Sequence, residues 1–169
     1  MRDGTRPATL MDHPAVVRVE RRAGEMFLGA PMQEIAADEA VSCEQFRALV
    51  DDDAAWIHRQ GGTVVGYLLA ERLDEAGHVE QVSVDPAFAG RRIGADLLDA
   101  AANWAAGQGL AMLTLTTFSE VPWNAPYYAR LGFEVLPQDR WGPELATRVQ
   151  EEVSHGLHRW ARVTMGRPT

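Results

Sequence analysis

Residues 82–98 read VSVDPAFAGRRIGADLL, and this stretch decides the fold. Val82 and Val84 end a segment in which apolar and polar residues alternate, which predicts a β-strand over residues 78–84. Ile93 and Leu97 open a pattern that keeps apolar residues on one face, which predicts an amphipathic helix over residues 93–105. The stretch therefore predicts a strand, a glycine-containing loop and a helix in direct succession.

The start of this helix has the chemistry of an anion site. The first N–H groups of a helix lack intrahelical partners and lie at the positive end of its dipole, so they bind phosphates well. Arg91 and Arg92 add positive charge at the same place, and Gly90 and Gly94 allow a ligand to approach the backbone. Two glycines at this spacing match neither the Rossmann fingerprint nor the P-loop. From the residues alone, a phosphate site and a simple strand-to-helix turn both remain open.

The flanking sequence predicts an α/β fold with a mixed sheet and one domain over residues 1–169. Apolar periodicity predicts further helices, with Asp12 and Ser42 as N-caps of the first two, over residues 12–26, 42–49, 126–131 and 144–153. Further strands are predicted over residues 55–60, 63–69, 112–117, 133–136 and 157–165. Gly61-Gly62 predicts a tight hairpin turn between the first two of these strands.

The composition excludes several classes of chemistry. The formal net charge of −8 argues against a nucleic-acid binder with a basic face. All 16 basic residues are arginines, which excludes P-loop and Schiff-base lysines. The single cysteine, Cys43, cannot close a disulfide within the chain, and no Cys/His cluster has zinc spacing, so no metal is expected. No apolar run approaches the ~20 residues that span a membrane, and we expect a cytoplasmic protein.

Most of the net charge of −8 comes from one segment, residues 34–53, which has seven acids and a single base, Arg47. Its seven acids are Glu34, Asp38, Glu39, Glu44, Asp51, Asp52 and Asp53. A solvated helix face explains such a run. An electrostatic funnel for a cationic substrate explains it equally, because a surface of one sign concentrates the opposite sign. Both interpretations remain open.

Two motifs resemble those of the GNAT superfamily of N-acetyltransferases. Val84-Asp85-Pro86 followed by Gly90-Arg91-Arg92-Ile93-Gly94 is similar to that family's acetyl-CoA-binding motif. Residues 124–133 (NAPYYARLGF) are similar to its second signature, in which a helical tyrosine, Tyr128, lies five residues before the phenylalanine of Leu-Gly-Phe. The resemblance covers roughly residues 5–165. It implies a mixed, mostly antiparallel central sheet flanked by helices, with a splayed strand pair that holds CoA.

The resemblance also implies roles for individual residues. Backbone N–H groups would bind the CoA pyrophosphate at Gly90, Arg91, Arg92, Ile93, Gly94 and Ala95. Main-chain groups of Val82 and Val84 would pair with the pantetheine arm. The asparagine that the family often has seven residues before the helical tyrosine is replaced by Val121, and Asn124, where the family usually has alanine, is our own candidate for a contact with CoA. Tyr128 would protonate the departing thiolate, and Glu80 lies where many members have a general base. The family has glycine at the position of Arg92, and this substitution is tolerable if residue 92 is already helical, because only its backbone N–H is then required.

For several candidate residues, a purely structural role is the alternative to a functional one. Glu80, between Val79 and Val82, suits a general base if its carboxylate faces inward, and is only the polar position of an alternating strand if it faces solvent. The histidines His78, His155 and His158 lack a third metal ligand and are expected to be structural. Cys43 has no visible base beside it and is expected to be an ordinary side chain.

The implied function is direct transfer of the acetyl group of acetyl-CoA, as acyl-donor cosubstrate, to a primary amine of a small molecule or peptide. A cationic amine is favoured if the acidic segment faces the acceptor. The alternative is a non-catalytic acetyl-CoA-binding or regulatory module with the same fold, although such a module would have little reason to keep both Tyr128 and Glu80. No nucleic-acid or membrane partner is expected, and a homodimer is supported by analogy alone.

Overall fold

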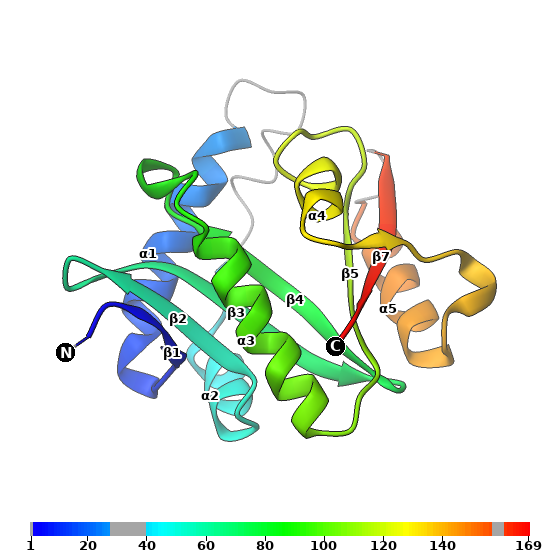
Figure 1. Ribbon diagram of the computed structural model, residues 1–169, viewed down its shortest axis with the longest axis horizontal. Helices are drawn as coiled ribbons and strands as arrows, with labels where there is room; N and C mark the ends of the chain where they lie inside the picture. The colour runs from blue at the N-terminus through cyan, green and yellow to red at the C-terminus, as the bar shows by residue number, and fades with distance from the viewer. Residues whose placement is uncertain (1, 28–39, 157–160) are drawn as a thin grey trace. The chain divides into compact units, whose positions relative to one another are not determined.

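The computed structural model describes residues 2–27, 40–156 and 161–169 (Figure 1). The strands are β1 (Gly4–Pro7), β2 (Ala55–Gln60), β3 (Thr63–Leu73), β4 (Ala76–Val84), β5 (Met112–Phe118), β6 (Glu134–Val135) and β7 (Arg162–Pro168). The α-helices are α1 (His13–Gly24), α2 (Cys43–Asp51), α3 (Ile93–Gly107), α4 (Ala125–Arg130) and α5 (Pro143–Ser154). Short 3-10 turns are η1 (Leu10–Asp12), η2 (Glu25–Phe27), η4 (Pro86–Phe88) and η5 (Gln138–Arg140).

The strands form one mixed sheet in the order β1-β2-β3-β4-β5-β7-β6. β1, β2 and β3 pair antiparallel in succession, and β7 pairs antiparallel with both β5 and β6. β4 and β5 are parallel, and their pairing runs only from Ala76 opposite Met112 to His78 opposite Thr114. The predicted α/β fold with a mixed, mostly antiparallel sheet flanked by helices is therefore confirmed.

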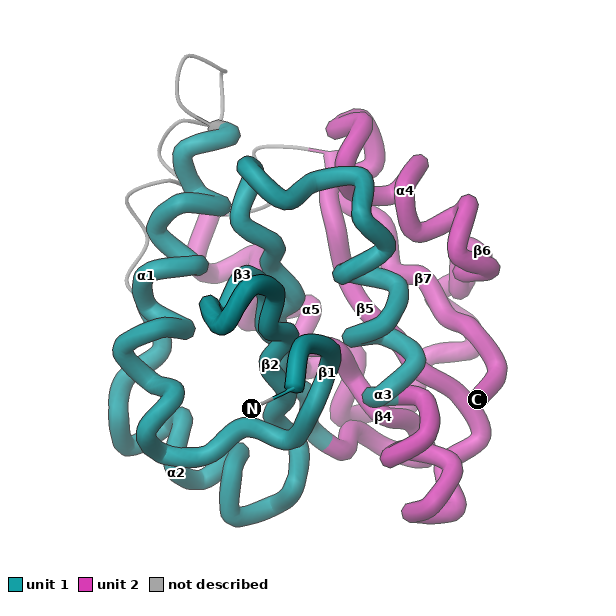
Figure 2. Tube along the Cα trace, turned by 60° about the vertical axis from the view of Figure 1, so that its left-hand side comes forward, with its two compact units in different colours: residues 1–71, 80–101 teal, residues 72–79, 102–169 magenta. Residues whose placement is uncertain are grey.

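The chain forms two compact units, coloured separately in Figure 2. Unit 1 comprises residues 1–71 and 80–101, and unit 2 comprises residues 72–79 and 102–169. The boundaries fall inside β3, β4 and α3, so three elements pass from one unit to the other. The expectation of one domain over residues 1–169 stays a prediction.

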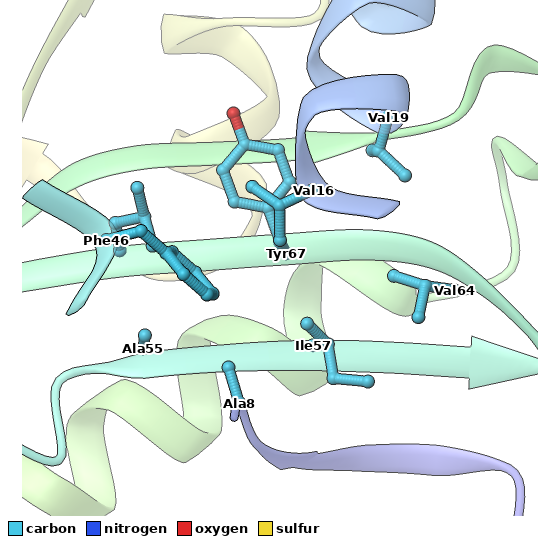
Figure 3. Packing of buried hydrophobic residues seen from close by; sticks show 9 residues of the cluster. Ala8, Val16, Val19, Phe46, Ala55, Ile57, Val64 and Tyr67 are labelled. Atoms are coloured by element: carbon cyan, nitrogen blue, oxygen red, sulfur yellow. The ribbon is translucent and has the colours of Figure 1, made fainter. Parts of the chain in front are cut away.

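In unit 1, α1 and α2 bury their apolar faces on β2 and β3. The cluster comprises Ala8, Val16, Val19, Phe46, Ala55, Ile57, Val64, Tyr67 and Leu69, eight of them labelled in Figure 3. Each large apolar side chain buried in this way contributes about 1.5–3 kcal/mol. The start of α2 is set by a capping box, because the Ser42 hydroxyl accepts from the Gln45 amide at 3.1 Å and the Gln45 side chain accepts from the Ser42 amide. The predicted N-cap at Ser42 is confirmed.

The first turns of α3 pack on the opposite face of β3, at Gly66. A methyl group at this position would lie 2.8 Å from Cγ2 of Ile93 and 3.2 Å from Cδ1 of Leu97. Successive strand residues point to opposite faces, so Gly66 meets α3 while Tyr67 enters the α1–α2 cluster. The absence of a side chain at Gly66 lets α3 approach the strand backbone.

In unit 2, β5 is covered on one face by α5 and on the other by the end of α3. Gly77 of β4 meets Trp104 and Ala105 of α3, each 3.1 Å from where its Cβ would lie. On the other face, the Thr116 hydroxyl donates to the carboxylate of Glu152 in α5 at 2.7 Å. Arg162 of β7 donates to both of these side chains, which anchors α5 to two strands.

The β3–β4 hairpin caps the N-terminus of α5. The carboxylate of Asp74, in the hairpin turn, accepts hydrogen bonds from the amides of Glu144 and Leu145, each at 3.0 Å. In return the Asp74 amide donates to the carboxylate of Glu144. A side chain at Gly142 would collide with the Asp74 carboxylate, so glycine leaves the room that this cap requires.

The structure differs from the predicted elements at both ends of the chain. The first element is β1 and not a helix: Gly4–Pro7 pairs with β2 from Gly4 opposite Arg59 to Pro7 opposite Trp56. Four residues that include glycine and proline carry no local strand signal, so the strand exists through its pairing with β2. The last strand is present as β7 from Arg162, and the predicted start at residues 157–160 lies outside the described residues.

Candidate active site

The loop between β4 and α3, residues 85–92, opens with a turn held by Asp85. The Asp85 carboxylate accepts from the Ala87 amide at 2.9 Å, and the Asp85 amide donates to the Val65 carbonyl of β3 at 2.8 Å. Further along, Gly90 has a φ of 78°, a left-handed conformation that glycine adopts without steric cost. The structure thus contains the predicted succession of strand, glycine-containing loop and helix.

Arg92 is also left-handed, with a φ of 62°, and α3 begins one residue later at Ile93. The condition under which arginine would be tolerable here, that residue 92 is already helical, is therefore not met. A non-glycine residue in the left-handed region carries a strain of about 1–2 kcal/mol, because its Cβ crowds the backbone. The chain thus holds an arginine in a conformation that favours glycine, at the position where the resemblance has glycine.

The start of α3 presents backbone donors to its surroundings. The Asp96 amide donates to the Arg92 carbonyl at 2.9 Å, and this bond opens the helical ladder. The amides of Ile93, Gly94 and Ala95 precede it and have no acceptor within the helix. They lie at the positive end of a helix of 15 residues. This arrangement suits an anion, phosphate above all.

Two exposed arginines lie beside these amides. Arg91 donates from Nη1 to Oε1 of Gln60 at 2.9 Å, and its guanidinium carbon lies 5.1 Å from the centroid of the Phe88 ring. Both partners are neutral, so neither compensates the positive charge. Within residues 2–27, 40–156 and 161–169, no carboxylate forms an ion pair with Arg91 or Arg92. The helix start therefore carries two arginines that have no ion-pair partner among the described residues, although the carboxylate of Asp96 lies in the same first turn.

β4 carries three of the predicted site residues. Val82 and Val84 are half-buried and lie beyond the part of β4 that pairs with β5, which ends at His78. Glu80 is exposed, and the negative charge of its carboxylate also acts on the buried phenol of Tyr67 in β3. Its role as a general base, and the pairing of Val82 and Val84 with pantetheine, stay predictions.

Tyr67 of β3 is a candidate site residue that the sequence did not indicate. It is fully buried, and burial is the main cause that raises the pKa of its phenol well above the ordinary value. The negative charges of Glu20 in α1 and Glu80 in β4 raise this pKa further. A tyrosine inside the apolar segment 63–69 has no local signal that separates it from core aromatics. The fold alone reveals its relation to the two carboxylates.

Tyr128 of α4 is 8% exposed and lies among aromatic rings. Its ring meets those of Tyr127 and Phe133 edge-on, with centroids 5.4 and 5.8 Å apart. Burial, followed by the neighbouring Tyr127, raises the pKa of Tyr128 above its ordinary value. The phenol therefore keeps its proton, and acts as a hydrogen-bond donor, throughout the neutral range.

Asn124 precedes α4 and is fixed to β5. Its Oδ1 accepts from the Thr117 hydroxyl at 2.6 Å, and its carbonyl accepts from the Tyr128 amide at 3.0 Å. Asn124 and Tyr128 thus lie together in unit 2. The other predicted site residues, Glu80, Val82, Val84 and residues 90–95, follow one another along unit 1.

The histidines and Cys43, which were expected to have no role in the site, lie in different environments. His78 is 2% exposed, and its Nδ1 lies 2.9 Å from the Thr114 hydroxyl; burial, followed by the charge of Arg148, lowers the pKa of His78 to about 4. His155 is exposed at the end of α5, whereas His158 lies outside the described residues. Cys43 is exposed and its Sγ lies 3.5 Å from Nδ1 of His13, a neighbour that the sequence did not show, and its expected role as an ordinary side chain stays a prediction.

The acidic segment is described only in part. Glu34, Asp38 and Glu39 lie outside the described residues. Asp51, Asp52 and Asp53 are exposed where α2 ends. These last three acids are a contiguous patch of negative charge in unit 1, the unit that also contains the β4–α3 loop.

Comparison of the sequence with known proteins identifies a family. A profile of the Acetyltransferase (GNAT) family matches residues 21–133. A mycothiol acetyltransferase of Amycolatopsis mediterranei (strain U-32) is 30% identical over 145 residues, which cover 79% of this chain. The chain spans 47% of the length of that relative. The chain therefore belongs to the Acetyltransferase (GNAT) family.

Solved structures share the fold across the whole chain. The PaiA N-acetyltransferase of Thermoplasma acidophilum, in complex with coenzyme A, has a TM-score of 0.74 at 14% identity and covers 100% of both chains. Rv2747 of Mycobacterium tuberculosis, in complex with CoA and NLQ, has a TM-score of 0.68 at 20% identity and covers 98% of each. In the described part of this chain, no helix is long and apolar enough to cross a membrane.

Proposed function

We propose that this chain transfers the acetyl group of acetyl-CoA directly to a primary amine of a small molecule or peptide. The observation that carries the proposal is the start of α3, where helix amides and two exposed arginines lie together in a GNAT-family chain. The PaiA enzyme and Rv2747 both share this fold and are CoA complexes, which supports CoA as the cosubstrate here.

The cofactor would lie along β4 and the β4–α3 loop. Amides of residues 90–95 bind the pyrophosphate, and the side chains of Arg91 and Arg92 add charge-assisted contacts. The main-chain groups of Val82 and Val84 pair with the amides of the pantetheine arm in the manner of an added strand. Asn124 offers its side-chain NH₂, since its oxygen is engaged by Thr117.

The chemistry is a direct attack of the neutral amine on the thioester carbonyl. Glu80 accepts the proton that the amine loses, and an N–H of β4 such as that of Val82 stabilises the oxyanion of the tetrahedral intermediate. The C–S bond then breaks, and CoA leaves as a thiolate. Tyr128 donates its phenolic proton to that sulfur, in keeping with a phenol that stays protonated at neutral pH.

The acceptor we propose is a cationic amine. The exposed acids Asp51, Asp52 and Asp53 favour it, because they raise the local concentration of cations. The Amycolatopsis relative is named for mycothiol, and it shares 30% identity with this chain over part of its length. That likeness supports a small-molecule acceptor more than a protein surface.

The test is CoA release from acetyl-CoA, followed with a thiol reagent, for a panel of cationic, neutral and peptide amines. We expect turnover with at least one cationic amine and a fall in kcat of about 100-fold for Tyr128→Phe, which removes the donor to the leaving thiolate. Tyr127→Phe is the matched control and retains activity. Binding of acetyl-CoA without turnover of any amine would instead support the non-catalytic module.

A further inference from the structure

The Asp85 carboxylate is held from outside its own loop by Arg22, in the last turn of α1. Nε of Arg22 lies 2.6 Å from Oδ2 of Asp85, while the other carboxylate oxygen accepts from the Ala87 amide at 2.9 Å. The side chains of Asp85 and Arg22 are 11% and 43% exposed, respectively. A single carboxylate thus joins α1 to the first turn of the β4–α3 loop.

This carboxylate depends on its partners because it is mostly buried. Desolvation acts to raise the pKa of Asp85, but the hydrogen bonds from Arg22 and Ala87, with the charges of Arg22 and Arg18, outweigh it and the pKa is lowered. The same pair raises the pKa of Arg22. Both groups are therefore ionised at neutral pH. Removal of the cation would leave a buried charge with one backbone donor, a situation that the turn relieves by rearranging.

A second side-chain contact, weaker than an ion pair, holds the β4–α3 loop. At its far end, Arg91 donates to Gln60, an exposed bond to a neutral group. An anion that binds Arg91 competes with Gln60, whereas both carboxylate oxygens of Asp85 are already engaged, one by Arg22 and the other by the Ala87 amide. The Arg22–Asp85 pair is therefore the side-chain tether that persists when a phosphate is bound.

We propose that Arg22 is a positioning residue for the cofactor. Through Asp85, it holds the β4–α3 loop in the conformation in which the amides of residues 90–95 face the pyrophosphate. Arg22 acts without touching the cofactor. This inference rests on the function proposed above for that loop.

The test is the affinity of the purified full chain for CoA, measured by isothermal titration calorimetry. We expect Arg22→Gln to raise the Kd for CoA about tenfold, while kcat at saturating acetyl-CoA stays within about twofold. Arg21→Gln is the matched control, since Arg21 is the exposed neighbour on the same helix, and it leaves the Kd unchanged. Arg22→Lys keeps the charge and recovers most of the affinity.

A second variant tests the same proposal even if the Arg22→Gln protein does not fold. Asp85→Asn retains an acceptor for the Ala87 amide but removes the charge, so we expect a similar rise in Kd and no further rise in the double variant. A purely structural role would lower the thermal unfolding temperature with an unchanged Kd, and this result overturns the inference. Equal rises for Arg21→Gln and Arg22→Gln overturn it too. If the unsubstituted chain binds no CoA, the proposed function itself fails.

Discussion

At the scale of single residues, Arg92 combines a backbone cost with a charge that the site uses. Its φ of 62° makes Arg92→Gly a substitution with two opposite effects. We expect stability to rise by up to about 1 kcal/mol, because glycine relieves the left-handed strain. We expect the Kd for CoA to rise about fivefold, because a charge beside the phosphates is lost.

Urea unfolding and calorimetric titration measure the two effects of Arg92→Gly separately. Arg92→Lys serves as the control, since it keeps both the charge and the strain and should bind CoA with nearly unchanged affinity. An Arg92→Gly variant that binds CoA as tightly as the unsubstituted chain would show that the side chain contributes nothing to phosphate binding.

The burial of His78 makes the free energy of unfolding depend on pH. This dependence extends up to about pH 6.5, above the range in which carboxylates titrate. Its folded-state pKa of about 4 lies below the value of 6.5 that an unperturbed histidine has, so the unfolded chain binds more protons between these values. Stability therefore rises with pH in this window and falls as the solution is acidified. From about pH 7 to pH 5 we expect a loss of about 2 kcal/mol in the free energy of unfolding.

The measurement for His78 is urea unfolding at several pH values between those limits. His78→Asn should remove most of the pH dependence, whereas His155→Gln, at an exposed position, should keep it. The depressed pKa values of Asp12 and Asp85 affect stability only at lower pH, so they do not obscure the effect. Equal slopes for His78→Asn and the unsubstituted chain would contradict the prediction.

At the scale of elements, the hairpin turn at Asp74 is the N-terminal cap of α5. Asp74→Ala removes the acceptor of two helix amides, and we expect a loss of about 1–2 kcal/mol in the free energy of unfolding. Asp139→Ala, in η5 of the same unit, is a control that changes stability by less than about 0.5 kcal/mol. Equal losses for both variants, measured by urea unfolding, would mean that the cap contributes nothing specific.

Elements with strong local signals could be predicted from the sequence. Ser42 and Gln45 form a capping box that marks the start of α2, and the doublet Gly61-Gly62 marks the turn between β2 and β3. The β4–α3 loop is also a local feature, and the structure contains the strand, loop and helix predicted there, while the binding of phosphate by residues 90–95 stays a prediction. The left-handed conformation of Arg92 could not be predicted, because the sequence does not show at which residue the helical conformation begins.

Features that join distant residues could not be predicted. Arg22 and Asp85 are 63 positions apart, Asp74 and Glu144 are 70 apart, and His13 and Cys43 are 30 apart. No periodicity or motif connects such pairs, because each contact exists only after the strands and helices have packed. β1 belongs to the same class, since its pairing with β2 is its main support.

At the scale of the whole molecule, the net charge of −8 hides an unequal distribution. Exposed arginines lie at the start of α3, where the proposed anionic cofactor binds, and exposed acids follow α2. If the acids attract a cationic acceptor, the triple substitution of Asp51, Asp52 and Asp53 by Asn should raise the KM for that amine about threefold at low ionic strength.

Salt and a neutral acceptor provide the controls for this prediction. The rise in KM should shrink as ionic strength increases, because the Debye length falls from about 30 Å at 0.01 M to about 10 Å at 0.1 M. The KM for a neutral amine, and the KM for acetyl-CoA, should not change. A triple variant with the same KM for the cationic amine at low salt would leave the acids as a solvated surface only.

The close packing at Gly66 affects where the acetyl group of the proposed cofactor would lie. Pantetheine joins the pyrophosphate to the sulfur through a fixed number of bonds, so wherever the phosphates are anchored, the thioester lies at a limited reach from them. A methyl group at residue 66 would meet Ile93 and Leu97 and lift the first turn of α3 away from the strand. The anchored end of the cofactor would move outward with that turn, and the acetyl group would be drawn back along its own arm. In the cofactor site that we propose, the absence of a side chain at Gly66 would therefore set how far the acetyl group extends.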